Sequence, residues 1–388
     1  MEVFCIFLMA FSTLLWVGFA LLPWRPWSNR QVLDSMAGAN GDSALDEITV
    51  LIPARNESEV IQHTLQSVIE QGTGMKIILI DDNSEDATVE KSREMQLSDL
   101  HIVQSPPLPA GWSGKLWALE QGRLHVTTPY TLLLDADIEL ARGLITALRE
   151  KMHTQGLSFI SLMAAPSMTS GWEKMLMPAF VHFFKVLYPF ARVNSHRTRV
   201  AAAAGGCILL ETRLLDHIGG FESIKSAVID DCALARRVKS KGSKIWLGLT
   251  HSVKSVRSYQ QLREIWDMVT RTAFAQLHYS VGMLLLCTLM MVVVYQVPVV
   301  MAASSNILIR QLALISLAIM FLTYVPMLRF YDRSAVWALG LPLVAALFLA
   351  MTWTSAIRYW QGERTRWKGR IYQSQAVAVD SFERKSGS

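Results

Sequence analysis

Apolar positions divide this chain of 388 residues into two kinds of region. Long, nearly uninterrupted apolar stretches stand near both ends, whereas between residues 41 and 254 short apolar runs alternate with mixed, helix-like segments. About 20 consecutive apolar residues are enough to cross a bilayer, whereas short β-rich runs separated by helical segments are typical of an α/β sheet. The pattern therefore predicts a globular α/β domain between membrane segments.

The N-terminal apolar stretch covers residues 3–23. The residues after it are aromatic and basic, as at a membrane interface: Trp24, Arg25, Trp27 and Arg30. A cleaved signal peptide is the alternative, but it needs basic residues before the apolar run and small residues after it. Here Glu2 precedes the run and a bulky tryptophan follows it. We therefore predict a transmembrane anchor over residues 1–24.

Three further apolar stretches follow the middle region, at residues 281–303, 312–328 and 335–357. They predict transmembrane helices within 281–357, followed by a basic polar tail over 358–388. One N-terminal and three C-terminal spans would place the middle domain and the tail on opposite faces, whereas the positive-inside rule favours the cytoplasm for both. One apolar stretch is therefore expected to be re-entrant or interfacial.

The domain predicted over residues 45–255 begins with a strand, a turn and a helix, as in a nucleotide-binding unit. The runs expected to form buried strands are 48–52, 76–80 and 131–134. Four apolar residues at helical spacing predict the first helix: Ile61, Leu65, Val68 and Ile69. Asn56 or Ser58 is available as its N-cap. The alternation predicts a largely parallel, Rossmann-like sheet covered by helices.

Composition narrows the class of protein. Hydrophobic residues make up 51% of the chain, which is too many for an ordinary soluble enzyme. The net charge of +5 comes from basic residues beside the apolar stretches, so it indicates juxtamembrane charge and no nucleic-acid partner. The four cysteines show no CxxC spacing, which indicates neither a zinc site nor a disulfide framework.

Acidic residues follow the apolar runs at the places where an α/β sheet presents its carboxyl edge to a ligand. Six polar residues from Asp81 to Asp86 come directly after one run, and Asp135 and Asp137 come after another. Each cluster alone is explained equally by a turn with helix-capping side chains. Two carboxylates at alternate positions after a buried run, however, repel each other unless a cation lies between them.

Asp135 and Asp137 therefore predict a Mg²⁺ or Mn²⁺ site, because hard cations take carboxylate oxygens and share them with phosphate oxygens. Such a metal would stabilise a departing nucleoside diphosphate. The sequence has no GxxxxGK[ST] and no GxGxxG after a strand, which disfavours an ATPase and a dehydrogenase.

A third acidic pair, Asp230 and Asp231, opens the helix-like segment 233–239. Helix capping explains adjacent aspartates at the start of a helix. The functional alternative makes one of them a general base that takes the proton of an attacking hydroxyl.

Four ordered motifs now resemble those of family 2 glycosyltransferases with the GT-A fold. They are PARNE (53–57), IDDNSEDA (80–87), DAD (135–137) and IDDCALARR (229–237). The resemblance covers residues 48–274. More narrowly, PPLPAGWSGKLWA (106–118) and WKGRIY (367–372) resemble the hopene-associated glycosyltransferases of hopanoid-producing bacteria and related carotenoid glycosyltransferases.

The resemblance implies donor-binding roles for five residues. Pro53, Arg55 and Glu57 would line the nucleotide pocket. Asp82 would contact the uracil or ribose, and Lys115 would approach the donor.

The resemblance also implies the catalytic roles. Asp137 would hold the metal, with support from Asp135. Asp231 would act as the base, and Asp230 replaces the glutamate that usually stands beside it. These roles describe an inverting transfer with in-line attack at the sugar carbon.

The QxxRW signature of processive family members is only partly present. Gln260 and Arg263 keep its first and fourth positions, but Glu264 takes the fifth and Trp266 comes two residues late. Arg263 or Arg271 is the candidate for diphosphate contact. The erosion of the signature favours transfer of one sugar over chain growth.

Two segments are candidates for the acceptor side. Residues 256–280 have the spacing of an amphipathic interfacial helix. The apolar segment 172–190 is either a core helix or a surface that enters the bilayer to admit a lipid. His182 and His196 are isolated, so we assign them no role.

The sequence therefore predicts a multi-pass enzyme of a bacterial inner membrane, with its catalytic domain facing the cytoplasm. It would move a sugar from a nucleotide-sugar, with a UDP-sugar as the expected donor, to a lipid such as a hopanoid or another terpenoid. A polyprenyl-phosphate sugar transferase or a polysaccharide synthase is the alternative. A transporter is more remote, because the apolar stretches offer almost no polar residues beyond Tyr295 and Gln296.

Overall fold

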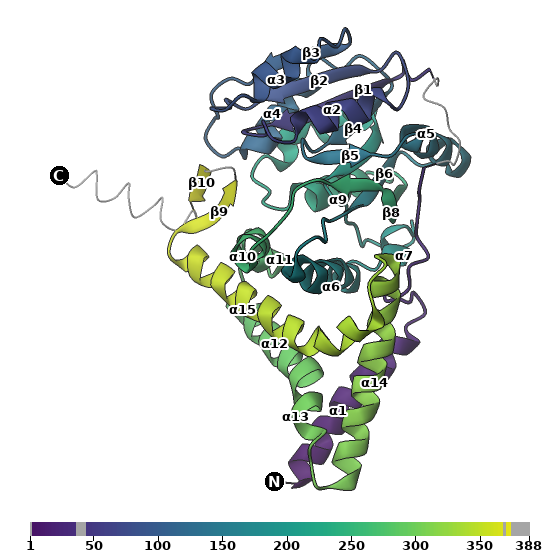
Figure 1. Ribbon diagram of the computed structural model, residues 1–388, viewed down its shortest axis with the longest axis vertical. Coiled ribbons are helices and arrows are strands. Elements are labelled where there is room, and N and C mark those ends of the chain that lie inside the picture. Colours follow the sequence, from purple (N-terminus) through teal and green to yellow (C-terminus); the bar gives the residue numbers. More distant parts are fainter. Residues whose placement is uncertain (1, 36–43, 368–369, 374–388) are drawn as a thin grey trace, which may run out of the picture. The chain divides into compact units, whose positions relative to one another are not determined.

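The computed structural model describes residues 2–35, 44–367 and 370–373 (Figure 1). The described residues form two compact units. The first, which we call the helical unit, takes its residues from 1–29, 168–189 and 259–388. The second, the sheet unit, takes its residues from 30–167 and 190–258. The chain thus leaves the sheet unit for the segment 168–189 and then returns to it.

Within the described residues, the sheet unit is built on one eight-stranded sheet of order β3-β2-β1-β4-β7-β6-β8-β5. The strands are β1 (Ile48–Ala54), β2 (Lys76–Asp81), β3 (Leu100–Gln104), β4 (Tyr130–Leu134), β5 (Ile138–Leu140), β6 (Phe159–Ala165), β7 (Cys207–Glu211) and β8 (Ile245–Ser255). The three predicted strands are confirmed as β1, β2 and β4. Their β-branched and leucine side chains are buried in the main core, together with apolar residues of the covering helices.

The sheet is mixed, so the prediction of a largely parallel sheet holds only in part. β3, β2, β1 and β4 run parallel, and so do β6 and β8. β7 is antiparallel to both β4 and β6, and β5 is antiparallel to β8. Only three residues separate β4 from β5. This link is too short for the crossover that a parallel neighbour requires, and β5 pairs instead at the far edge of the sheet.

Helices of the sheet unit follow most of its strands. They are α2 (Ile61–Ile69), α3 (Thr88–Glu94), α4 (Gly114–Arg123), α5 (Leu144–Gln155), α7 (Phe190–Val193), α8 (Thr212–Ile218) and α9 (Asp230–Ser240). α2 buries Ile61, Leu65 and Val68, as their spacing predicts. α4 lies close to the sheet, because a Cβ at Gly122 would come within 2.7 Å of Ile80 Cδ1.

The predicted N-cap of α2 is wrong. The helix begins at Ile61 with Val60 at its N-cap and no side-chain cap. Asn56 instead uses its Oδ1 to accept a hydrogen bond from the Glu85 amide, at 2.8 Å. The Ser58 amide donates to Asp86 Oδ2 at 3.0 Å. Asn56 and Ser58 therefore form hydrogen bonds with the loop after β2. These hydrogen bonds compete with capping of α2, and rules for helix starts do not include such competition.

The helical unit contains four helices, among the described residues, that are long and apolar enough to cross a membrane. They cover Glu2–Leu21, Val281–Met301, Ile307–Phe330 and Ala335–Trp360. In the labels of Figure 1 they are α1 (Glu2–Leu21), α12 (Val281–Met291) continued by α13 (Val297–Met301), α14 (Ile307–Phe330) and α15 (Leu341–Trp360). Apolar helices thus stand near both ends of the chain, as predicted.

After α15 the described chain ends in a hairpin of β9 (Glu363–Trp367) and β10 (Arg370–Gln373). Much of the predicted basic tail, including Lys368 and everything after Gln373, lies outside the described residues.

The predicted interfacial helix over 256–280 is two shorter helices. α10 covers Leu262–Thr270 and α11 covers Ala273–Gln276. α10 buries Ile265 and Val269, in keeping with its amphipathic spacing. Its position at a membrane interface stays a prediction.

The apolar segment 172–190 contains α6 (Gly171–Leu187), which belongs to the helical unit. Its rings contact the long helices: His182 lies 5.1 Å from Tyr324 and Phe183 lies 5.3 Å from Phe348, between ring centroids. Buried Lys185 donates from Nζ to the carbonyl of Ser28 at 2.8 Å. These contacts favour a packed helix within the helical unit.

Candidate active site

Carboxylates and one lysine line a pocket in the sheet unit, at the carboxyl ends of β1 and β4. Its polar lining consists of Lys115, Asp135, Asp230 and Asp231, with Pro53 and Gly205 beside them. The remaining lining is mostly aliphatic. The pocket therefore brings together five of the predicted site residues, among them Pro53 of the PARNE motif.

Lys115 holds two of these carboxylates. Its Nζ lies 2.7 Å from Asp135 Oδ1 and 3.4 Å from Asp230 Oδ2. It stands in the first turn of α4, and its ammonium reaches Asp135, which directly follows β4. Burial disfavours the ammonium, but the neighbouring Asp135 and Asp230 carboxylates outweigh that effect and raise the pKa of Lys115. The lysine therefore stays charged.

Asp231 lies in the first turn of α9 and has a strongly perturbed carboxyl. Burial and, after it, the charge of Asp230 raise the pKa of Asp231 to about 7, against the lowering effect of Lys115. Burial likewise raises the pKa of Asp135 despite its ion pair with Lys115. A carboxyl with a pKa near neutrality can accept a proton at the pH of the cell.

Gly205 lies beside Lys115 and Asp231. A Cβ at this position would lie 3.3 Å from Lys115 Nζ and 3.4 Å from Asp231 Oδ2. The residue follows the alanine run and precedes β7, and the Asp135 amide donates to the carbonyl of Gly206 at 3.1 Å. The antiparallel pairing of β4 and β7 therefore brings a glycine against Asp231, where a Cβ would crowd the end of the Lys115 side chain.

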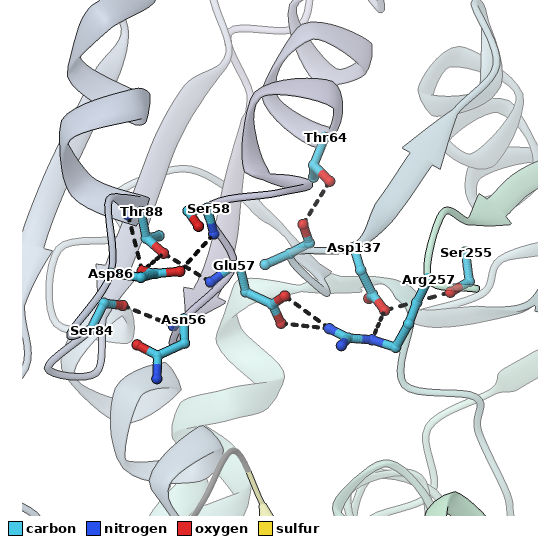
Figure 2. Close-up of polar contacts among 11 residues, drawn as sticks. Asn56, Glu57, Ser58, Thr64, Ser84, Asp86, Thr88, Asp137, Ser255 and Arg257 are labelled. Atoms are coloured by element: carbon cyan, nitrogen blue, oxygen red, sulfur yellow. Dashed lines mark hydrogen bonds and ion pairs between the residues drawn. The ribbon is translucent and has the colours of Figure 1, made fainter. Parts of the chain in front are cut away.

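Asp137 points to a different partner, Arg257 (Figure 2). Arg257 Nε lies 2.9 Å from Asp137 Oδ2, and its Nη2 lies 2.9 and 2.8 Å from the two oxygens of Glu57. Thr64 on α2 donates to the carbonyl of Ala136 at 2.8 Å and so fixes the turn between the two aspartates. One guanidinium thus joins the PARNE glutamate to the second aspartate of the DAD motif.

Arg257 was missed by the sequence analysis. It follows β8, and the antiparallel pairing of β5 with β8 sets Ile138 opposite Ser255. The Val256 amide also donates to the Asp137 carbonyl at 2.9 Å. One pattern in the sequence could have indicated Arg257. It is a basic residue just past the last strand of a domain in which acidic residues follow the other strands.

Arg55 and Asp82 stabilise the loop after β2. Arg55 Nη1 donates to the carbonyls of Asp82 and Asn83, at 2.6 and 2.8 Å, and its Nη2 pairs with Glu85 at 3.1 Å. The Asp82 side chain is fully buried. Asn83 has a φ of 55°, in the left-handed region that asparagine tolerates. Nucleotide contact by Arg55 and Asp82 stays a prediction.

Asp86 fixes the same loop from its other side. It accepts hydrogen bonds from Ser58 and Thr88 (Figure 2). Burial opposes ionisation, but these hydrogen bonds outweigh it and lower the pKa of Asp86 to about 2.

The two remaining predicted residues lie in the helical unit. Arg263 is in α10, and Arg271 directly follows that helix. Diphosphate contact by either arginine stays a prediction.

Metal binding can be judged from the donor set. Among the described residues, no group of three or more His, Cys, Asp or Glu side chains is placed to hold a metal ion. Asp135 and Asp137 each use one oxygen in an ion pair with a basic side chain. Two carboxylates suit a hard cation that completes its coordination with water and phosphate oxygens, as Mg²⁺ usually does. The residues present therefore fit a metal that binds with a diphosphate.

Known proteins are similar to this chain in sequence and in fold. Residues 49–219 match glycosyl transferase family 2. The chain is 23% identical over 336 residues to 4,4'-diaponeurosporenoate glycosyltransferase of Staphylococcus aureus strain USA300, covering 84% of this chain and 88% of that one. The protein of the same name from Staphylococcus haemolyticus is 31% identical over 123 residues, 32% of each chain.

Among solved structures, the chain is similar to the mannosyltransferase PcManGT of Pyrobaculum calidifontis, determined with GDP-Man and Mn²⁺. The TM-score is 0.53 at 17% identity, covering 91% of this chain and 98% of that one. At this identity the likeness shows a shared fold, and it confirms the predicted fold class. The chain is a glycosyltransferase that carries a family 2 domain with the GT-A fold.

Proposed function

We propose that this glycosyltransferase is membrane-bound and transfers one sugar, with inversion, from a nucleotide-sugar to a terpenoid lipid. The observation that carries the proposal is the pocket in which Lys115, Asp135, Asp230 and Asp231 meet at the carboxyl edge of the sheet. Donor phosphates are commonly bound at this edge of an α/β sheet.

Asp231 is the proposed base. Its carboxylate would take the proton of the acceptor hydroxyl as that oxygen attacks the sugar carbon, opposite the leaving diphosphate. A pKa of about 7, raised by burial and by Asp230, lets it accept this proton near neutral pH. Gly205 leaves space for an acceptor oxygen beside it. Lys115 would keep Asp135 and Asp230 in place and present a positive charge to the donor.

Asp135 and Asp137 would hold the divalent cation. When bound, Mg²⁺ or Mn²⁺ neutralises the negative charge that develops on the departing diphosphate. PcManGT, with its bound GDP-Man and Mn²⁺, supports a metal-assisted reaction and makes a GDP-sugar a second candidate donor beside the UDP-sugar predicted from the sequence.

A terpenoid acceptor is supported by the Staphylococcus aureus relative, a glycosyltransferase named for the carotenoid acid 4,4'-diaponeurosporenoate. The four apolar helices of the helical unit are long enough to keep the enzyme at a bilayer. We propose the bacterial inner membrane, with the sheet unit in the cytoplasm, where nucleotide-sugars are available. A hopanoid is the other terpenoid acceptor that the sequence suggests.

The test uses the full chain purified into nanodiscs. We would supply radiolabelled UDP- and GDP-sugars with hopanoid, carotenoid-acid and polyprenyl-phosphate lipids, in Mn²⁺ or in EDTA. Metal-dependent label in a terpenoid glycoside or glycosyl ester would support the proposal. Label in an acid-labile polyprenyl phosphate would favour the alternative transferase, and a growing polysaccharide would favour the synthase. No label from any donor would overturn the proposal.

A further inference from the structure

Arg257 joins two carboxylates that the proposed reaction uses for different purposes. Its Nε pairs with Asp137 at 2.9 Å and its Nη2 pairs with Glu57 at 2.8 Å. Asp137 belongs to the proposed metal site, and Glu57 belongs to the motif assigned to the donor nucleotide. Figure 2 shows the guanidinium lying between the two side chains.

The three side chains differ in exposure. Glu57 and Asp137 are 10% and 16% exposed, whereas Arg257 is 36% exposed. The two carboxylates are therefore held within the protein, and the arginine is the part that solvent or a ligand can reach. The single nitrogen Nη2 contacts both oxygens of Glu57, so the arginine stays near the site when the contact of its Nε with Asp137 is lost.

A divalent cation at Asp137 cannot bind independently of this arginine. The guanidinium already donates to Oδ2 of Asp137, and a cation on the same carboxylate would lie within a few ångströms of a permanent positive charge. Like charges at such a distance repel strongly in a partly buried site. An arriving diphosphate removes the conflict, because its oxygens accept from a guanidinium and also coordinate the metal.

We propose that Arg257 is a positioning residue that occupies the place of the divalent cation at Asp137 when the donor is absent. On donor binding it turns from Asp137 to the diphosphate while it stays paired with Glu57. This inference rests on the proposed function and deepens it. If Arg257 behaves in this way, metal and nucleotide bind cooperatively, because both require the ion pair between Arg257 and Asp137 to open. Linkage makes the effect reciprocal, so each ligand raises the affinity for the other.

The experiment measures Mn²⁺ binding by the electron paramagnetic resonance signal of the free ion. It uses the full chain in nanodiscs of zwitterionic lipid, without nucleotide and with UDP or GDP. For the wild type we expect weak binding of Mn²⁺ alone and binding about tenfold tighter with a nucleoside diphosphate that the site accepts.

Two variants of Arg257 separate its charge from its shape, and a third variant is the control. Arg257→Gln removes the competing charge, so Mn²⁺ alone should bind about tenfold tighter than in wild type, and nucleotide should add little. Arg257→Lys keeps the charge, so Mn²⁺ alone should bind weakly, as in wild type. Arg213→Gln is the matched control, because Arg213 is 72% exposed and pairs with Glu211 in the same unit.

The inference is overturned if Arg257→Gln binds Mn²⁺ alone no tighter than wild type, or if Arg257→Lys gains as much affinity as Arg257→Gln. Absence of Mn²⁺ binding in every state would also overturn it. These readouts do not depend on sugar transfer. A failure of the inference therefore leaves the transferase proposal to its product assay, and an enzyme without product can still show the Mn²⁺ behaviour.

Discussion

Lys115 and Arg257 each neutralise one carboxylate of the DAD motif, yet their surroundings differ. Lys115 is a compact ammonium at the start of α4 and bridges Asp135 to Asp230 within the pocket. Arg257 is a planar, more exposed group after β8 and bridges Asp137 to Glu57. The comparison suggests that the two residues have different roles. The lysine fixes the charges around the proposed base, whereas the arginine changes its partner from Asp137 to the diphosphate when the donor binds.

The largest expected effect comes from Asp231, the proposed base in the pocket that Lys115 lines. Asp231→Asn keeps the size of the side chain but cannot accept the proton, so transfer should fall by about 10²–10⁴-fold. Nucleotide-dependent Mn²⁺ binding should persist, because Asp231 is not a proposed ligand. Turnover in radiolabel assays measures the effect. An Asn variant that transfers sugar at the wild-type rate would contradict the base assignment.

Removal of the positive charge of Lys115 should have the second-largest effect on turnover. Lys115→Met leaves Asp135, Asp230 and Asp231 without their nearby cation, so we expect a loss of about 10²–10³-fold in turnover. Because the pocket is partly exposed, the free energy of unfolding should fall by only about 2 kcal/mol, less than for a fully buried pair. Turnover and thermal unfolding in nanodiscs measure the two effects. Unchanged turnover would remove the lysine from the mechanism.

The pH profile sharpens the same comparison. Asp231 acts as a base only when ionised, and its pKa is raised to about 7, so transfer by the wild type should decline as the pH falls below about 7. Lys115 opposes this rise, so Lys115→Met should move the decline to higher pH. Arg257→Lys should leave it in place. Rate profiles from pH 5 to 9, roughly the range in which such a group titrates, would decide. Equal pH profiles for Lys115→Met and Arg257→Lys would contradict the different roles assigned to the two basic residues.

A smaller effect is expected when the planar guanidinium of Arg257 is replaced by another positively charged group. Arg257→Lys keeps the charge but loses the planar fork, so kcat/KM for the donor should fall about tenfold, mainly through KM. Steady-state kinetics with varied donor measure it, and Arg213→Lys provides the control. A fall in kcat alone would indicate that Arg257 acts on the transition state rather than on donor binding.

The smallest effect tests a carboxylate held by hydrogen bonds from Ser58 and Thr88. Asp86 has its pKa lowered to about 2, so its ionised form stabilises the fold above a pH of about 4, and this contribution is lost as the pH falls towards 2. Because Asp86 is partly exposed, Asp86→Asn should lower the free energy of unfolding by about 1 kcal/mol at neutral pH. Thermal unfolding measures it. No destabilisation at neutral pH would show that these hydrogen bonds do not favour the ionised form.

The parts of the fold and site that follow from local sequence were predictable. The apolar runs of β1, β2 and β4 and the acidic residues after them required only strand length and alternation with helices. Arg257 was not predictable in this way, since its partner Asp137 lies 120 positions earlier and the antiparallel pairing of β5 and β8 brings them together. No local pattern specifies that pairing. Asn56 and Ser58 failed as caps for a similar reason, because residues of the next loop compete for them.

The insertion of α6 has a consequence for dissecting the protein. The segment 168–189 interrupts the sheet unit in sequence but finds its packing partners among the terminal helices. Buried Glu173 on α6 accepts hydrogen bonds from the amides of Thr169 and Tyr259. These two residues lie at the start of the segments by which the chain enters the helical unit after β6 and β8. A truncation that removes the terminal helices would therefore expose the apolar side of α6 in the remaining chain. Aggregation of such a fragment would reflect its lost partners rather than an unstable sheet, and a soluble version requires replacement of α6 by a short polar linker.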